Sequence, residues 1–290
     1  MKGKVRRLRF LPIFVAIAPI VFAAGPELDQ ARKLYNLTDF DQSLKVLQAA
    51  PQKDAAVYEL MGRDYYMLGD YKKATETLEK AVAADPASAE KSLWLARAYG
   101  RRAETSNPIS AAGQASKACQ FFERAVQLDP QNLDALNDLF DYYLEAPGFL
   151  GGGFDKAQNT AARIAVVSQA EGYAVQAKLA EHRKQLGSAE EQLRRAIDAA
   201  PQQIGKIIEL ARLLAKQGRY QESDQTVARA DKIAPDSARL LYAKADLYVK
   251  TGRHLDVARS LLERYLTCQL TPDDPPRSDA EKLLRKARGA

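Results

Sequence analysis

Residues 55–88 read AAVYELMGRDYYMLGDYKKATETLEKAVAADPAS, and this stretch carries the pattern from which the architecture follows. Apolar and small side chains recur at helical spacing twice within it, first over residues 58–65 and then over residues 71–81. Gly69 stands between the two runs, where glycine can adopt the left-handed conformation that ends a helix. Pro86 ends the second run because proline lacks the N–H group that another turn requires. The stretch therefore predicts two helices joined by a tight turn.

A single pair of helices cannot bury its apolar side alone, so it is expected to stack on copies of itself. Residues 204–237 repeat the pattern without a gap, with Gly218 and Pro235 at the matching turn and end. Both stretches have the period of about 34 residues that is typical of the tetratricopeptide repeat (TPR). The first stretch resembles that family closely, although Tyr58 replaces the usual tryptophan. The residues that carry the resemblance are Tyr58, Met61, Gly62, Tyr65, Gly69, Asp70, Tyr71, Ala74, Leu78, Ala81 and Pro86.

The resemblance implies an all-α fold, a right-handed TPR superhelical solenoid in which each repeat contributes a helix, a turn and a second helix. Partial copies of the motif on both sides of the two regular stretches predict about seven repeats. A proline hinge then leads to an amphipathic helix, for which Ser278 and Glu281 fit a capping box. We expect this helix, within residues 271–290, to cap the array. The predicted repeats span residues 24–54, 55–88, 89–132, 133–169, 170–203, 204–237 and 238–270.

Two adjacent repeats carry extra residues at the same point, between their first and second helices. The first insertion falls within residues 101–114 and the second, which is rich in glycine, within residues 146–153. We expect both to be loops that lie side by side on one edge of the solenoid, with Phe149 and Leu150 folded onto that edge. Insertions on one face of a repeat array often mark a binding face. No Gly-Lys-Ser/Thr follows the glycine run, so a phosphate-binding loop is not expected.

Residues 1–23 have the composition of a signal peptide. Five basic residues precede a nearly uninterrupted apolar run from residue 10 to residue 22, and small residues allow cleavage after Ala23. The apolar run is shorter than the roughly 20 residues that a membrane span needs. We therefore expect a periplasmic or secreted protein. An uncleaved N-terminal membrane anchor is the alternative, and only in that case would a membrane be a partner.

The charge of the chain argues against nucleic acid as a partner. The full chain has a net charge of +6, with 43 Lys and Arg against 37 Asp and Glu. Without the five basic residues of the signal segment, 38 basic residues remain against 37 acidic ones, a net charge of +1. The basic character therefore belongs mostly to residues 1–23, and neither nucleic acid nor an anionic membrane is indicated.

Few residues could carry catalysis. The two histidines, His182 and His254, lie in different predicted repeats, each without a nucleophile or metal ligands at a useful spacing. Cys119 and Cys268 also fall in repeats that are not neighbours, and such repeats do not touch in a solenoid. We therefore expect no enzyme activity, no metal and no cofactor.

The resemblance implies that the first helix of each repeat lines a concave groove that binds a partner. It places basic, then acidic, then basic residues along this groove, and Trp94, the only tryptophan, lies near its start. Aromatic residues and arginine are enriched at interface hot spots. Two other interpretations stay open: insertion 101–114 could cover Trp94, and the charge bands could be only a solvated face. The candidate partner-binding residues are Arg63, Tyr66, Leu93, Trp94, Arg97, Arg101, Asp141 and Glu145, with Phe149 and Leu150 as candidates on the second insertion.

Some TPR proteins hold C-terminal carboxylates through a Lys/Asn clamp, but the matching positions in the first repeat are Leu28 and Arg32, so that activity is not implied. The sequence thus favours a non-catalytic protein–protein interaction scaffold in the cell envelope, which binds a protein or peptide in its groove. One alternative is a ligand-handling accessory subunit of a periplasmic transport system, which would need an enclosed pocket or pore. The other is an enzyme whose site is formed by the two inserted loops.

Overall fold

The computed structural model describes residues 25–289, and within this range the chain forms fifteen α-helices and one 3-10 helix, with no strand. The predicted signal segment lies outside the described residues. The bounds are α1 Pro26–Asn36, α2 Phe40–Ala49, α3 Ala55–Met67, α4 Tyr71–Ala84, α5 Ala89–Thr105, α6 Pro108–Leu128, α7 Leu133–Glu145, η1 Gly148–Leu150, α8 Phe154–Val167, α9 Gln169–His182, α10 Leu186–Ala199, α11 Ile204–Lys216, α12 Tyr220–Ile233, α13 Ala238–Thr251, α14 Leu255–Thr267 and α15 Arg277–Ala287.

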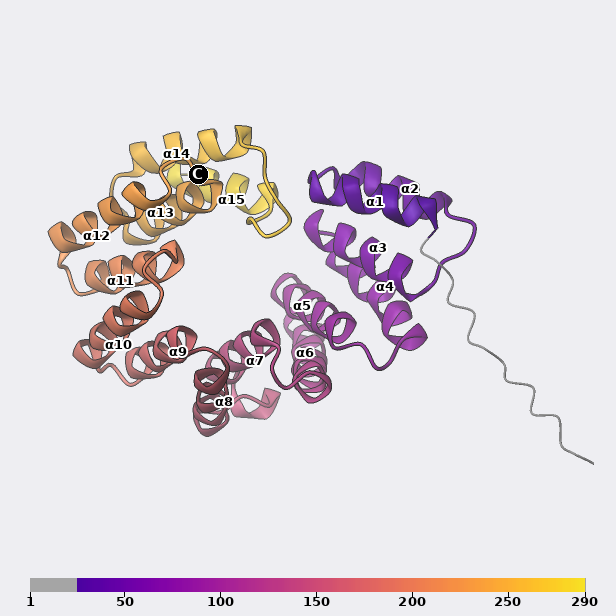
Figure 1. Ribbon diagram of the computed structural model, residues 1–290, viewed down its shortest axis with the longest axis horizontal. Coiled ribbons are helices and arrows are strands. Elements are labelled where there is room, and N and C mark those ends of the chain that lie inside the picture. Colours follow the sequence, from indigo (N-terminus) through magenta and orange to yellow (C-terminus); the bar gives the residue numbers. More distant parts are fainter. Residues whose placement is uncertain (1–24, 290) are drawn as a thin grey trace, which may run out of the picture.

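Consecutive helices pack as seven pairs, from α1 with α2 to α13 with α14, and successive pairs stack on one another. The last helix, α15, packs against α14 and α13. Figure 1 shows the pairs following one another around an open centre. The structure thus confirms the predicted all-α solenoid of seven helix pairs with a C-terminal capping helix.

The apolar core is divided along the array into three clusters of buried residues. They span residues 28–67, 74–179 and 177–284, and each joins helices of neighbouring pairs. This is the arrangement expected of a solenoid, in which each repeat buries its apolar side against the next. Cohesion therefore comes from contacts between neighbours.

The local sequence explains the first regular pair, α3 and α4. Gly69 has φ +80° and so makes the left-handed turn after α3, while the Asp70 carboxylate caps α4 by accepting a 3.1 Å hydrogen bond from the Lys73 N–H. Gly62 lets the two helices approach, because a Cβ at this position would collide with the Leu78 side chain. The small and large residues of the motif therefore pack as predicted.

The first insertion is not a loop, and here the prediction was wrong. Helix α5 continues to Thr105 and α6 begins at Pro108, so the extra residues lengthen both helices. Asn107 caps α6 by accepting a 3.1 Å hydrogen bond from the Ser110 N–H, and Pro108 occupies the first turn, where its missing N–H costs nothing. Two residues separate the helices, which form a long hairpin at this point.

The second insertion is a short turn around η1 that lies beside α6, as expected. The Tyr142 hydroxyl lies within hydrogen-bonding distance of both the Ala115 carbonyl oxygen, at 2.8 Å, and the Leu150 carbonyl oxygen, at 2.7 Å, so it joins the second insertion to α6 just after the first insertion. Leu150 is half-buried, but Phe149 points outward and is 84% exposed. The expectation that Phe149 folds onto the solenoid was therefore wrong.

The predicted capping box of the last helix is also absent. Helix α15 begins at Arg277, so Ser278 is already helical, and no side chain caps the helix. Pro276 takes the position before the first turn. The start of α15 is therefore set by the fixed φ angle of Pro276, and not by a side-chain cap from Ser278.

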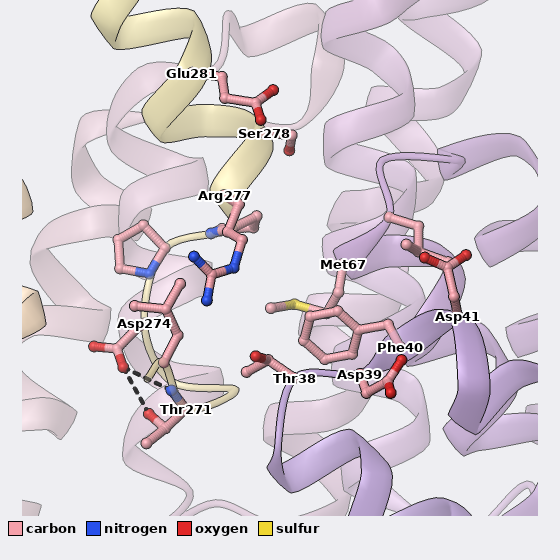
Figure 2. Close-up of a pocket in the computed structure, with 14 residues that line it drawn as sticks. Thr38, Asp39, Phe40, Asp41, Met67, Thr271, Asp274, Arg277, Ser278 and Glu281 are labelled. Carbon is pink, nitrogen blue, oxygen red and sulfur yellow. Dashed lines mark hydrogen bonds between the residues drawn. The ribbon is translucent and has the colours of Figure 1, made fainter. Parts of the chain in front are cut away.

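The solenoid curves until its two ends face each other, which the sequence did not predict. In Figure 1, α15 lies near α3 and α5, far from it in sequence. A guanidinium nitrogen of Arg101 in α5 lies 3.1 Å from a carboxylate oxygen of Asp279 in α15. A cavity of about 260 Å³ separates the turn at residues 38–41 from the hinge at residues 270–278. Figure 2 shows side chains from both ends directed into this space.

Candidate binding site in the concave groove

Helices α3 and α5 place arginine and aromatic side chains along the concave side of the early repeats. Arg63 and Tyr66 lie one turn apart on α3, and Trp94, Arg97 and Arg101 follow at intervals of three and four residues on α5, so each set shares one helix face. With Tyr35 of α1 and Tyr71 of α4 they form one contiguous set. We name these seven residues the arginine–aromatic ladder: Tyr35, Arg63, Tyr66, Tyr71, Trp94, Arg97 and Arg101.

Guanidinium groups lie over the rings of the ladder. The Arg63 Cζ atom lies 4.5 Å from the centre of the Trp94 ring and 4.9 Å from that of Tyr35, and the Arg97 Cζ atom lies 5.1 Å from Trp94. Arg101 lies over Tyr71 at 5.2 Å. Contacts of this kind contribute roughly 0.5–2 kcal/mol each, and more as they lose water. The ladder therefore ties together the first three repeats.

The aromatic rings pack edge to face. The centre of the Tyr66 ring lies 5.5 Å from Trp94 and 5.5 Å from Tyr71, in T-shaped arrangements. Burial raises the pKa of Tyr66 to about 12, so its hydroxyl stays protonated at neutral pH. Trp94 is half-buried among Arg63, Arg97 and Tyr66. Its neighbours in this set come from α3 and α5.

Each arginine of the ladder also meets a carboxylate. Arg63 pairs with Glu90 at 3.1 Å, Arg97 pairs with Asp138 at 2.6 Å, and Arg101 pairs with Asp279. Burial raises the pKa of the Asp138 carboxyl, and the facing Arg97 opposes that shift. The arginines are therefore held in place before any partner arrives.

Pairs between neighbouring repeats neutralise several of the charges in the predicted bands. Within the acidic band, Asp141 pairs with Lys178 at 2.7 Å. Glu181 pairs with Arg212 at 3.3 Å. Successive first helices are thereby connected by ion pairs along the groove, and the band pattern reflects these connections.

Leu93 was predicted to line the groove, but it is 4% exposed and packs in the core beneath the ladder. The structure therefore removes it from the surface. Sequence reasoning missed five contributors: Tyr35 and Tyr71, which the helical pattern assigns to the core, Glu90, Asp138, one turn after Asp134, and Asp279. The spacing of Asp134 and Asp138 was a signal that could have been used, because both lie on the face that meets α5.

Asp141 and Glu145 do not join the ladder. They line a separate pocket of about 430 Å³, together with Lys178, Glu181 and Arg212. Glu145 is exposed there. Phe149 and Leu150 lie on η1, beside α6, and belong to neither site. The structure therefore brings together Arg63, Tyr66, Trp94, Arg97 and Arg101 from the predicted set and separates the others.

Polar groups of α6 and α7 come together beside the second insertion, but without an activated nucleophile. The Cys119 thiol lies 3.8 Å from a Glu123 carboxylate oxygen, which accepts a 2.7 Å hydrogen bond from the Tyr143 hydroxyl. Burial, and then the Glu123 charge, raise the pKa of Cys119 to about 11, so the thiolate is disfavoured. Over residues 25–289, no group of three or more His, Cys, Asp and Glu side chains could hold a metal ion. In the same range no helix has the length and apolar character to cross a membrane.

The tetratricopeptide repeat family model matches residues 55–88, and a second tetratricopeptide repeat model matches residues 208–275. The chain is a tetratricopeptide repeat protein. No curated protein matches this TPR protein in sequence. Such repeats are typical of protein–protein interaction scaffolds, which use extended concave surfaces for binding. The family therefore indicates a scaffold and leaves its partner open.

Solved structures share the fold of this TPR protein. A TPR protein from Parabacteroides merdae has a TM-score of 0.59 and 13% identity, covering 90% of this chain and 97% of that chain. A thermophilic TPR protein from Thermus thermophilus has a TM-score of 0.52 and 21% identity, covering 65% of this chain and 97% of that chain. The human IFIT1 dimer with PPP-AAAA has a TM-score of 0.53 and 19% identity, covering 83% of this chain and 54% of that chain. At these identities the likeness concerns the fold alone.

Proposed function

We propose that this TPR protein is a non-catalytic scaffold of the cell envelope that binds a protein or peptide segment at the arginine–aromatic ladder. The observation that carries the proposal is the partly exposed set of Arg63, Trp94, Arg97 and Arg101 on the concave side, whose arginine side chains are 23%, 24% and 30% exposed. Tryptophan, tyrosine and arginine are the residues most enriched at interface hot spots.

The contacts within the ladder prepare it for binding. The guanidinium groups already lie over rings and beside carboxylates, so their side chains lose little conformational freedom when a partner docks. Ordering a flexible side chain at an interface costs roughly 0.5–1.5 kcal/mol. A ladder that is ordered in the free protein avoids much of that cost, and this supports the groove as the binding surface.

The envelope location rests on residues 1–23. Their basic start, apolar run and small residues before Ala24 support export and cleavage after Ala23. The test is the N-terminal sequence and intact mass of the protein isolated from its native host. A mature chain that begins at Ala24 is expected. A full-length chain in the membrane fraction would establish the anchor instead.

Handling of a small ligand for a transport system is the second candidate, and the cavity between the two ends favours it. Phe40 and Met67 on one side and Leu270 and Pro275 on the other border a partly open cavity of about 260 Å³. A small molecule that co-purifies with the protein and is released by Met67→Trp, which fills the cavity, would support this function. If native mass spectrometry shows only the free protein, the scaffold is favoured.

The scaffold is tested by affinity capture from cross-linked envelope fractions of the native host. The wild type is compared with Trp94→Ala/Arg97→Ala, which removes the centre of the ladder. The matched control is Asp224→Asn. It breaks the ion pair between Asp224 and Arg253 in the later repeats, whose charged groups lie 2.8 Å apart, and it leaves the ladder intact. A protein captured by the wild type and the control, but lost from the ladder variant, is expected. Capture that is equal in all three would show that the ladder is not the site.

A further inference from the structure

Arg101 differs from the other arginines of the ladder in the origin of its carboxylate. Arg63 and Arg97 receive theirs from helices of the same or the next repeat. The Arg101 guanidinium instead donates to both carboxylate oxygens of Asp279, at 3.1 and 3.2 Å, from the last helix of the chain. Arg101 also contacts the nearby Glu104 at 2.9 Å, but that carboxylate is mostly exposed. Arg101 thus pairs with a carboxylate of α15, whereas Arg63 and Arg97 each pair with a carboxylate of the next repeat.

The arginine presents a prepared carboxylate site. Its Nη2 atom donates to the Tyr71 hydroxyl at 2.9 Å, and the Tyr71 ring lies beneath the guanidinium. These contacts fix the plane of the guanidinium, and a fixed guanidinium plane favours carboxylates. Asp279 occupies this site in the free protein.

The two ends are held together by polar contacts rather than by a shared core. Among the described residues, no cluster of buried apolar side chains combines residues of the first repeats with residues of the hinge or α15. A cavity remains between them. Figure 2 shows Phe40 and Met67 of the first repeats on one side of it and Thr271 and Arg277 of the hinge on the other. Separation of the ends would therefore expose little buried apolar surface.

The ion pair itself is weak enough to exchange. The side chains of Arg101 and Asp279 are 30% and 24% exposed, and pairs with such access to water shift an equilibrium by only about two- to fivefold. A carboxylate from another molecule could form the same hydrogen bonds with Arg101. The exchange would leave the bonds within the ladder unchanged.

We propose that Asp279 stands in for a carboxylate of the partner, so that the groove takes an acidic protein segment that displaces α15 from Arg101. This inference rests on the proposed function. In the free protein the C-terminal helix closes the groove, and the partner is a segment rich in Asp and Glu whose carboxylate takes the place of Asp279. Because the closed form must open first, the apparent affinity is lowered by the fraction of molecules that are closed.

The test uses the full chain and a phage-displayed library of random twelve-residue peptides. Wild type, Asp279→Asn and Arg101→Met are panned, and the selected peptides are titrated by fluorescence anisotropy. Asp224→Asn is the matched control, because its partner Arg253 likewise lies over a tyrosine ring, at 4.2 Å from Tyr220, but joins neighbouring repeats. A wild-type selection enriched in Asp and Glu is expected. Asp279→Asn should bind these peptides about two- to fivefold more tightly.

Arg101→Met should bind the same peptides about two- to fivefold more weakly than Asp279→Asn does, because both variants open the ring but only Asp279→Asn keeps the guanidinium that binds the peptide carboxylate. The control should bind as the wild type does. Selected peptides without acidic enrichment, or an affinity that Asp279→Asn leaves unchanged, would overturn the inference. If such peptides still lose binding on Trp94→Ala, the ladder is the site and only the acidic chemistry is wrong. If no peptide is selected by any variant, or selection ignores the ladder, the proposed function fails with it.

Discussion

Arg101 and Asp279 are 178 positions apart in sequence, yet their side chains lie 3.1 Å apart and close the solenoid into a ring. The contact joins the third helix pair to the capping helix. It depends on the curvature that all the intervening repeats accumulate, since each pair contributes a small rotation. The distance between Arg101 and Asp279 therefore depends on the curvature of the whole array.

Asp279→Asn should open the ring without destabilising the helices. The pair is accessible to water, so the free energy of unfolding should fall by less than about 1 kcal/mol. The radius of gyration, measured by small-angle X-ray scattering at low salt, should nevertheless increase. In the wild type the same increase should appear as sodium chloride is raised to roughly 1 M, because salt screens exposed pairs. The asparagine variant should show no salt response; a wild-type profile that stays constant over the same salt range would contradict this.

Most of the fold could be predicted from the sequence because its determinants are local. The turn at Gly69, the close approach at Gly62 and the spacing of apolar residues each act within one repeat. Arg63, Trp94 and Arg97 could also be placed on one side, since the family fixes which face of the first helix is concave. Stacking of these three on one another follows from contact between adjacent repeats, which the repeat period sets.

The remaining features depend on distances that no local pattern contains. Contact between Arg101 and Asp279 requires the sum of the rotations of several repeats, so a small change in each would separate them. The first insertion was predicted as a loop because its residues exceed the length of a standard repeat, although Asn107 and Pro108 within it are a cap and a first-turn proline of a helix. Leu93 sits at a position that usually faces the groove, but here it is covered by its neighbours in the core.

Asp64 should make the stability of the protein depend on pH. Its side chain is fully buried between α2 and α3, where one oxygen accepts a 2.8 Å hydrogen bond from the Ser43 hydroxyl and the other has no partner in the described structure. Burial raises the pKa of Asp64 from the ordinary 3.8 to about 8. Between these values the unfolded chain has released a proton that the folded chain keeps. The free energy of unfolding should therefore fall as pH rises through this window, by a few kcal/mol at most, and level off above about pH 8.

Urea unfolding of wild type and Asp64→Asn at about pH 5 and about pH 8.5 measures this effect. The asparagine variant cannot ionise, so its stability should change less over this range, although at the lower pH it should be less stable by roughly 1–2 kcal/mol because its amide group lacks partners. Asp29→Asn on the surface of α1 is the control and should retain the wild-type dependence. If the free energy of unfolding of Asp64→Asn changed with pH as much as that of the wild type, Asp64 would be ionised in the folded protein.

Lys206 and Glu171 should stabilise the contact between the fifth and sixth helix pairs only when both are present. The Lys206 side chain is 6% exposed and its ammonium group lies 2.6 Å from a Glu171 carboxylate oxygen. Glu171→Gln leaves the buried Lys206 ammonium group without its closest partner. The free energy of unfolding should fall by about 2–3 kcal/mol. This is less than the loss for a fully buried pair, because Glu171 is partly exposed. Lys206→Met should cost less, since its apolar chain can stay packed.

A double-mutant cycle in urea separates these effects. Adding Lys206→Met to Glu171→Gln should recover part of the lost free energy of unfolding, because the unpaired charge is removed. The comparison pair is Arg195 with Glu191, which is exposed on α10 and should give a coupling of only a few tenths of a kcal/mol. Equal coupling energies for the two pairs would contradict a special role for burial at Lys206.

Gly62 and Gly100 should respond in opposite directions to the same substitution, Gly→Ala. Both lie inside helices, α3 and α5, where alanine is favoured over glycine by about 1 kcal/mol. At Gly100 an added Cβ would meet no atom within 4 Å, so Gly100→Ala should raise the free energy of unfolding by roughly 0.5–1 kcal/mol. At Gly62 the Cβ would collide with the Leu78 side chain, which is itself fully buried, and overpacking of this kind costs about 1–3 kcal/mol. Gly62→Ala should therefore lower the midpoint of thermal unfolding while Gly100→Ala raises it. A rise in both midpoints would show that Leu78 can move aside, and that the close approach of α3 and α4 does not depend on glycine.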